Sequence, residues 1–335
     1  MINNQGSVRV DLLGGTLDIY PINVILPQVK TLNMATNLMA SVEIMDSNES
    51  VIEFVSHDYH LSKSFGLEVL ENVDDHLNLF GPFEFMARIL SFFRPTHGMK
   101  IIFSSGAPTG SGLGGSSAMG AVFFDALNSK FSRNFEPQEI VRIVQTIESK
   151  ILNAGPAGYQ DYYPSLYGGI LSLNAGVEGV KVEQLYTTEL ADFLTSNTTL
   201  IYSGESRQSG INNWEVYKSF FDKKEHVVKG LQEINHLANK AYQNIKSENY
   251  DELILNIKAE GEIRENLFPT ILTTKMKDFK SKLQTLCPKS GIKVCGAGGG
   301  GCFLVTDVSK INLNPILNEF EMRKLDFSIC HPLEK

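Results

Sequence analysis

The chain has 335 residues, of which 42% are hydrophobic and 20% are charged, an ordinary balance for one large globular domain or two medium ones. Its formal net charge of -8 argues against non-specific nucleic-acid binding, which requires clustered lysines and arginines. No apolar run reaches the roughly 20 residues of a membrane span, and the N-terminal residues lack the basic and apolar parts of a signal peptide. The four cysteines form no CxxC pair and are typical of reduced thiols. These features predict a soluble cytoplasmic protein that binds neither nucleic acid nor membrane.

The first half of the chain alternates strand patterns with helical ones. Runs of apolar and β-branched residues bounded by turn residues predict strands at 7–13, 38–45, 50–56 and 99–105. Helices are predicted at 83–93 and from Pro137 onward, the second with a buried stripe every three or four residues. Glu148 borders that stripe, where it is either a salt-bridge partner or a functional group, and the spacing alone favours the salt bridge.

The second half begins with predicted strands at 168–174 and 198–204. Helical periodicity then dominates from about 214 to 285, and "IKVCGAGGGGCFLVT" at 292–306 is typical of a strand, a glycine loop and a strand. This order predicts an α+β protein with mixed sheets in two lobes, which meet near residues 175–195.

The stretch "PTGSGLGGSSAMG" at 108–120 lies between a predicted strand and a predicted helix. It lacks the lysine of a Walker A loop, and its GxGxxG spacing is not followed by the acidic residue that a dinucleotide site needs. Glycines with positive φ allow the backbone to approach a phosphate, and a helix that begins near Ser116 directs free N–H groups toward it. The pattern therefore predicts a polyphosphate-binding loop, in which Ser116 or Ser117 supplies a hydroxyl ligand for Mg²⁺.

Three motifs together resemble the galactokinase, homoserine kinase, mevalonate kinase and phosphomevalonate kinase (GHMP) superfamily. They are "VRVDLLGGTLD" at 8–18, "PTGSGLGGSSA" at 108–118 and "KVCGAGGGGCFLV" at 293–305, in the order that the superfamily has. The variant "GGTLD" is most similar to the sugar-kinase branch, such as heptose 7-phosphate kinases and fucokinase-like enzymes. The resemblance implies an α+β fold of two lobes, an ATP-binding lobe like ribosomal protein S5 at 1–185 and a ferredoxin-like lobe at 186–335.

The resemblance also implies catalytic and nucleotide-binding roles for particular residues. Asp161, in "GYQDYY", matches the carboxylate that takes the acceptor's proton, and Arg9 matches the arginine that steadies this base and the transferred phosphoryl group. Ser116 and Glu148 match the ligands of Mg²⁺. The residues expected to bind ATP are Pro108, Gly110, Ser111, Gly112, Leu113, Gly114, Gly115, Ser116 and Ser117.

The expected acceptor site draws on the first and third motifs and one further loop. Asp18 matches the acidic residue that binds sugar hydroxyls, and Gly15 lies in the same motif. Ser206 and Arg207 belong to the polar loop at 202–214, which either meets a phosphate or hydroxyls of the substrate or starts the next helix. Gly298 and Gly299 are expected near the substrate, in a glycine run at 296–301 that supports the nucleotide loop.

The resemblance thus implies transfer of the γ-phosphoryl group from ATP, with Mg²⁺, to a hydroxyl of a sugar or sugar phosphate, by a monomer or a homodimer. A mevalonate-pathway kinase or diphosphate decarboxylase shares the fold and the aspartate, and is the first alternative. A sugar sensor that binds without turnover is the second, although a sensor has no need for both Asp161 and Glu148.

Overall fold

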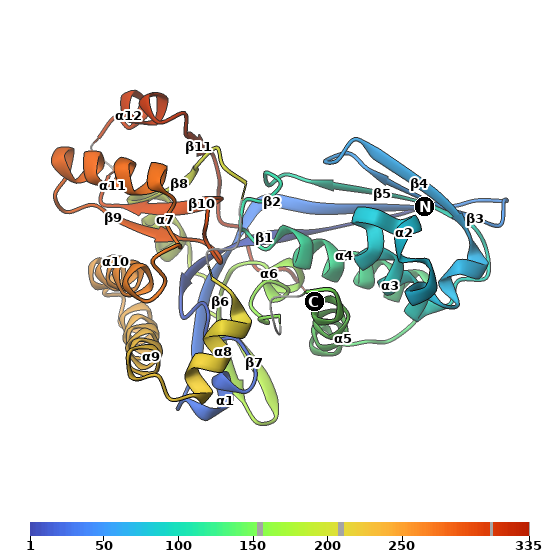
Figure 1. Ribbon diagram of the computed structural model, residues 1–335, viewed down its shortest axis with the longest axis horizontal. Coiled ribbons are helices and arrows are strands. Elements are labelled where there is room, and N and C mark those ends of the chain that lie inside the picture. The colour runs from blue at the N-terminus through green and yellow to red at the C-terminus, as the bar shows by residue number, and fades with distance from the viewer. Residues whose placement is uncertain (153–156, 207–210, 309–310, 335) are drawn as a thin grey trace.

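The computed structural model describes residues 1–152, 157–206, 211–308 and 311–334. Within these residues the chain forms a seven-stranded sheet and a four-stranded sheet; in Figure 1 the four-stranded sheet lies at the left, and the seven-stranded sheet runs from the lower middle to the right. Helices accompany both sheets, so the predicted α+β class is confirmed.

The large sheet is organised around one long strand. β2 (Lys30–Asp46) pairs with β1 (Ile2–Leu13) along most of its length, with β5 (Met99–Ser105) through its second half and with β6 (Ile170–Gly176) through its first five residues. β3 (Val51–Ser56) is parallel to β5, and the other neighbours in this sheet are antiparallel. The strand order is β4 (Leu61–Gly66), β3, β5, β2, β6 and β7 (Gly179–Gln184), with β1 off this path.

Helices α3 (Glu84–Phe93), α4 (Gly115–Lys130) and α5 (Pro137–Ile151) pack together, with α4 against β1 and β2. Side chains around most of α4 are buried, because it lies between the sheet and the other two helices. On α5 the predicted stripe faces inward at Ile140 and Val144, and Glu148 is buried with it. The short helices of this part are α1 (Ile22–Ile25), α2 (Leu77–Phe80) and α6 (Tyr163–Tyr167).

The small sheet is antiparallel throughout, with the strand order β11 (Arg323–Leu325), β8 (Thr198–Tyr202), β10 (Cys302–Thr306) and β9 (Gly291–Val294). The long helical stretch predicted at 214–285 consists of α8 (Asn213–Phe221), α9 (Glu225–Lys246), α10 (Tyr250–Leu267) and α11 (Thr274–Leu286). The remaining helices are α7 (Thr188–Asn197) and α12 (Asn314–Glu319).

The two parts are linked at the C-terminus as well as through the chain between β7 and α7. Ile329 forms a β-bridge with Thr36, and Pro332 forms one with Gly168, so the last residues return to the large sheet. The predicted division of the chain at residues 185 and 186 falls between β7 and α7 and stays a prediction. In the described residues we find no helix with the length and apolar character that crossing a bilayer requires.

Candidate functional site

The glycine loop, residues 108–117, follows β5 and ends in the first turn of α4. The φ angles of Gly110, Gly112 and Gly114 are 69°, 75° and 73°, in the left-handed region that glycine adopts without strain. α4 begins at Gly115, one residue from the predicted start. The N–H groups of its first turn have no carbonyl partners within the helix and are available to an anion.

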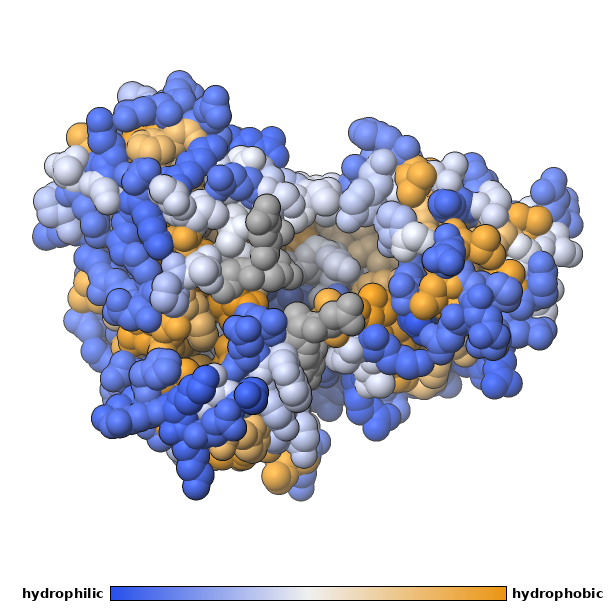
Figure 2. Space-filling view, in the orientation of Figure 1, coloured by the Kyte–Doolittle hydropathy of each residue, from blue (hydrophilic) through white to orange (hydrophobic). Residues whose placement is uncertain are grey.

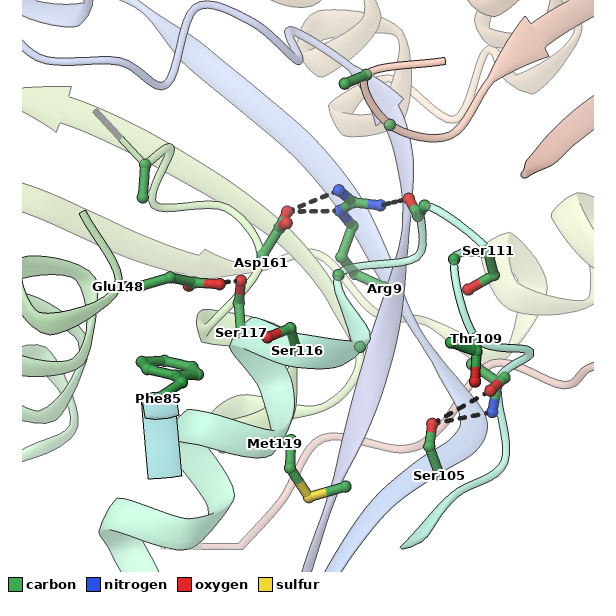
Figure 3. Close-up of a pocket in the computed structure, with 18 of the residues that line it drawn as sticks. Arg9, Phe85, Ser105, Thr109, Ser111, Ser116, Ser117, Met119, Glu148 and Asp161 are labelled. Atoms are coloured by element: carbon green, nitrogen blue, oxygen red, sulfur yellow. Dashed lines mark hydrogen bonds and ion pairs between the residues drawn. The ribbon is translucent and has the colours of Figure 1, made fainter. Parts of the chain in front are cut away.

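This loop lines a cleft with a volume of about 450 Å³. A hollow between the two parts of the molecule is visible in Figure 2. All three sequence motifs contribute to the cleft lining, the third through Gly296 and Ala297. In Figure 3, Arg9 and Asp161 face each other above the start of α4, while Met119 lies further along that helix and Phe85 of α3 lies beside it. The cleft therefore has a charged region and an apolar region on either side of the glycine loop.

Arg9 connects the three motifs to Asp161. Its Nε and Nη2 atoms lie 2.8 and 2.7 Å from Oδ1 of Asp161, and Nη1 donates to the carbonyls of Gly112 at 2.8 Å and Cys295 at 2.7 Å. Burial acts to lower the pKa of Arg9, but Asp161 and then Asp11 outweigh this effect, so the pKa is raised and the guanidinium stays charged. The Asp161 side chain remains one quarter exposed, at 25%. It is thus held by a buried cation yet open to the cleft.

Glu148 accepts two hydroxyl hydrogen bonds on a single oxygen. Ser117 Oγ donates to Glu148 Oε2 at 2.8 Å, and the hydroxyl of Tyr162 donates to the same atom at 2.6 Å. All three side chains are buried, and Glu148 and Ser117 line the cleft. Ser116 also lines the cleft but is exposed, so the side chain joined to Glu148 is that of the second serine (Figure 3).

The third motif packs directly against the glycine loop. A Cβ atom on Gly296 would lie 2.6 Å from the carbonyl oxygen of Gly112, and one on Gly301 would lie 2.6 Å from that of Ser111. The N–H of Cys302 donates to the same Ser111 carbonyl at 2.6 Å. The third motif therefore supports the glycine loop, and this packing requires glycine where the two backbones touch.

Asp18 lies in the cleft lining with Asp161, Thr16 and Gln160. It is 4% exposed, and its Oδ2 accepts a hydrogen bond from the N–H of Gln160 at 3.1 Å. Burial, and secondly the charge of Asp161, raise the pKa of Asp18 to about 7, although the Gln160 hydrogen bond acts in the opposite direction. Asp18 therefore changes its charge near neutral pH.

A buried network of four charged residues, which the sequence did not reveal, lies behind the first motif. Lys293 Nζ is 2.9 Å from Asp11 Oδ2 and 3.3 Å from Glu260 Oε1, and Arg264 Nη1 is 3.3 Å from Asp11 Oδ2. Glu260 Oε2 accepts from the N–H of Gly14 at 2.7 Å, which ties the network to the glycine turn. The pKa of Glu260 is raised by burial, and that of Asp11 is lowered by Lys293 and Arg264 against the effect of its own burial. The i, i+4 spacing of Glu260 and Arg264 is the one feature of the local sequence that indicates part of this network.

The structure brings most of the predicted site residues to this one cleft. The predicted residues that line it are Arg9, Asp18, Pro108, Gly110, Ser111, Gly112, Gly114, Gly115, Ser116, Ser117, Glu148 and Asp161.

The other predicted residues are not among those that line the cleft. Leu113 is in the hydrophobic core, and Gly15 lies against the Asp11 carboxylate. Gly299 donates its N–H to the carbonyl of Ile271 at 2.9 Å, and Gly298 also lies against Ile271. The backbone of Ser206 lies beside Gly300. Arg207 is outside the residues that the structure describes.

Comparison with known proteins agrees with this geometry. The family of GHMP kinases, N terminal domain, matches residues 81–169, which include the glycine loop, Glu148 and Asp161. Mevalonate kinase of Methanocaldococcus jannaschii is 26% identical over 319 residues, covering 88% of this chain and 91% of that protein. The bifunctional fucokinase/GDP-fucose pyrophosphorylase of Arabidopsis thaliana is 24% identical over 344 residues, covering 96% of this chain and 32% of that protein.

Solved structures share the fold across almost the entire chain. Galactokinase of Lactococcus lactis, complexed with galactose, has a TM-score of 0.77 at 14% identity and covers 99% of this chain and 95% of its own. A D-glycero-D-manno-heptose 1-phosphate kinase of Bacteroides thetaiotaomicron has a TM-score of 0.74 at 20% identity, covering 100% and 99%. Residues 81–169, which contain the loop at the centre of the cleft, match the N-terminal domain of GHMP kinases, and the similarity to mevalonate kinase extends along most of the chain, so the comparisons support an ATP-dependent phosphotransferase of the GHMP kinase superfamily.

Proposed function

We propose that this kinase transfers the γ-phosphoryl group of ATP to a hydroxyl of a sugar or a related polyol, with Asp161 as base. The observation that carries the proposal is the ion pair of Arg9 and Asp161 beside the glycine loop. A Cβ atom on Gly114 would lie 3.0 Å from the Asp161 side chain, so the carboxylate is adjacent to the loop that would hold the phosphates. A base in this position can reach both an acceptor hydroxyl and the transferred group.

The glycine loop would bind the triphosphate through backbone N–H groups, most of them in the first turn of α4. The neighbouring apolar residues Phe83, Phe85, Met86 and Phe103 offer a surface for the adenine ring. Arg9 would offset the negative charge that develops as the phosphoryl group moves toward the acceptor.

Ser117 and Glu148 fit a Mg²⁺ ion that arrives with ATP. A hydroxyl and a carboxylate are hard oxygen ligands, and Mg²⁺ in kinases takes few protein ligands because phosphate oxygens and water complete its shell. We assign the hydroxyl to Ser117 in preference to Ser116, because Ser117 contacts Glu148. When bound, the ion would supply charge neutralisation between the phosphates.

The charges of the cleft lining favour an uncharged acceptor. Arg9 and Arg264 are its cations among the described residues, and they already pair with Asp161 and Asp11. A carboxylate entering beside Asp18 would meet a negative charge without a described cation to offset it. Sugar hydroxyls, in contrast, can donate to Asp18, and a buried carboxylate discriminates against compounds that lack them.

A phosphorylated sugar remains within the proposal if the loop at 202–214 contributes. Arg207 has the planar fork that suits a phosphate group, and its assignment to the acceptor phosphate rests on the sequence alone. Mevalonate is the second candidate acceptor, because three of the curated relatives are mevalonate kinases.

The test is ATP consumption measured with neutral sugars and polyols, sugar phosphates, mevalonate and homoserine. We expect turnover with a sugar or sugar phosphate, and a loss of about 10²-fold or more in kcat for Asp161→Asn. Preferred turnover of mevalonate would overturn the proposed acceptor class, while an unchanged rate in Asp161→Asn would overturn the role of the base.

A further inference from the structure

Tyr162 is a buried tyrosine whose hydroxyl is directed at the proposed metal ligand. It is 0% exposed and follows Asp161 directly in the chain. Its hydroxyl donates to Glu148 Oε2 at 2.6 Å, a short distance of the kind found when the acceptor is ionised. A phenol hydroxyl that faces a carboxylate oxygen at this distance is the donor of the hydrogen bond.

Two donors therefore converge on one carboxylate oxygen from different elements. Ser117 approaches from the first turn of α4, while Tyr162 approaches from the turn before α6. Glu148 itself lies near the end of α5. A carboxylate has about four acceptor positions, so a side chain held by two hydroxyls can still act as a ligand. The two hydrogen bonds fix the rotamer of the Glu148 carboxylate before a cation binds. The side chain therefore loses less conformational entropy on metal binding than a free side chain would.

The backbone of Tyr162 is also held in place. Its carbonyl accepts a hydrogen bond from Ser165 Oγ at 2.7 Å, and its N–H donates to the carbonyl of Tyr159 at 3.4 Å. The turn that fixes the Tyr162 ring is thus the turn that presents Asp161 to the cleft. Through its hydrogen bond to Glu148, the Tyr162 side chain therefore connects the turn that carries Asp161 to the Glu148 carboxylate.

We propose that Tyr162 is a positioning residue that orients Glu148 for Mg²⁺ and thereby couples the proposed metal site to Asp161. This inference rests on the proposed function, because it requires Glu148 to be a ligand of the metal. It predicts that removing one hydroxyl from the core weakens the response to Mg²⁺ and leaves the acceptor site intact.

The experiment measures ATP binding by calorimetry with and without Mg²⁺, together with the Mg²⁺ concentration that gives half-maximal activity. The ratio of the two ATP dissociation constants reports how strongly the protein couples metal to nucleotide. In Tyr162→Phe we expect the dissociation constant without Mg²⁺ divided by the one with Mg²⁺ to fall by about tenfold. The Mg²⁺ concentration for half-maximal activity should rise by about the same factor, which is the lower end of the effects seen for residues that orient a metal ligand. ATP binding without Mg²⁺ and the KM for the acceptor should match the wild type.

Tyr163→Phe is the matched control. Tyr163 is the next residue, is 3% exposed, and packs its ring against Tyr159 at a centroid distance of 6.3 Å. The substitution Tyr163→Phe removes a tyrosine hydroxyl from the same buried region without removing either hydroxyl that donates to Glu148 Oε2, so the Mg²⁺ response of this variant should equal that of the wild type. Tyr162→Phe keeps the ring and its packing, and the melting temperatures of Tyr162→Phe and Tyr163→Phe, compared with that of the wild type, show whether a weaker Mg²⁺ response comes from unfolding.

Glu148→Gln separates the two levels of the proposal. If Glu148→Gln leaves the Mg²⁺ response unchanged, the proposed metal site itself is wrong. If Glu148→Gln weakens the response and Tyr162→Phe does not, or if Tyr163→Phe weakens it as much as Tyr162→Phe, the role of Tyr162 is overturned. In the double variant Tyr162→Phe with Glu148→Gln, we expect no loss of Mg²⁺ coupling beyond that of Glu148→Gln alone, because Tyr162 acts through Glu148.

Discussion

Arg9 Nη2 lies 2.7 Å from Asp161 Oδ1, and Arg9 Nε lies 2.8 Å from the same oxygen, so two nitrogens of one guanidinium converge on a single oxygen of the proposed base. The same guanidinium donates to a backbone carbonyl of the glycine loop and to one of the third motif. A change at Asp161 should therefore alter catalysis more than nucleotide binding, because the loop keeps its contacts to Arg9.

For Asp161→Asn we expect kcat to fall by about 10²-fold or more, since an amide cannot take the proton of the acceptor hydroxyl. The ATP dissociation constant, measured by calorimetry, should remain within a few-fold of the wild-type value. The control is Asp58→Asn, which changes a different carboxylate of the same cleft lining. Wild-type kcat in Asp161→Asn would remove this residue from the mechanism.

The two serines of the glycine loop should differ in their effect on the metal. Ser117 contacts Glu148, and Ser116 is exposed in the same helical turn, so the pair provides its own control. Ser117→Ala should raise the Mg²⁺ concentration needed for half-maximal activity by about tenfold or more, and Ser116→Ala should leave it near the wild-type value. A larger effect of Ser116→Ala would return the hydroxyl ligand to Ser116.

Acceptor binding should depend on pH through Asp18. Its pKa is about 7, and sugar hydroxyls would donate to the ionised form. If only that form binds, the KM for the acceptor rises by about fivefold from pH 7 to pH 6, following the loss of ionised carboxylate. In Asp18→Asn the acceptor KM should be higher throughout and nearly independent of pH over this range. The same pH dependence in wild type and variant would assign it to another group.

The same pKa makes Asp18 a source of instability at alkaline pH. Its pKa is about 7 in the folded protein and 3.8 as the ordinary value, so the folded state holds a proton that the unfolded state releases between these values. Relative to the ionised form, the proton that folded Asp18 binds more tightly contributes its full stabilisation below about pH 4, and this stabilisation is lost as the pH rises through 7. Asp18→Asn should therefore raise the free energy of unfolding at pH 8 by on the order of a few kcal/mol, since one pKa unit is worth about 1.4 kcal/mol. Urea denaturation should show a smaller gain at pH 5, and a gain of equal size at both pH values would contradict this explanation.

Arg207 should act on phosphorylated acceptors alone. Arg207→Lys keeps the positive charge but cannot reproduce the planar two-point contact with a phosphate, which should cost on the order of 2 kcal/mol, roughly thirtyfold in affinity. The measurement compares kcat/KM for a sugar and for its phosphate in the variant and in the wild type. Equal losses on both acceptors would leave Arg207 with a structural role.

Lys293 should be essential to the stability of the fold. It is fully buried between Asp11 and Glu260, so Lys293→Met leaves two buried carboxylates with less compensation. We expect the free energy of unfolding to fall by about 3–5 kcal/mol in urea denaturation. Lys229→Met is the control, because Lys229 pairs with Glu225 on the surface of α9, where an ion pair contributes about 0.5 kcal/mol or less. Similar losses in the two variants would contradict the importance of the buried network.

The sequence by itself determined the features that depend on neighbouring residues. The glycines at 110, 112 and 114 have the positive φ angles that they alone adopt easily, and the strand before them and the helix after them follow from local patterns. Asp161 and Arg9 could be named as partners only through the resemblance to a family, because 152 positions separate them in the chain.

Only the tertiary structure decided which side chains of these elements meet. The choice between Ser116 and Ser117 depends on the rotation of α4 relative to α5, since adjacent residues on a helix point about 100° apart. The contact of Tyr162 with Glu148 depends in the same way on the turn before α6. Asp11, Lys293, Glu260 and Arg264 come from β1, β9 and α10, and each alone has the pattern of a surface charge. Packing the two sheets against α10 removes water from all four, and the loss of hydration makes their mutual pairing necessary.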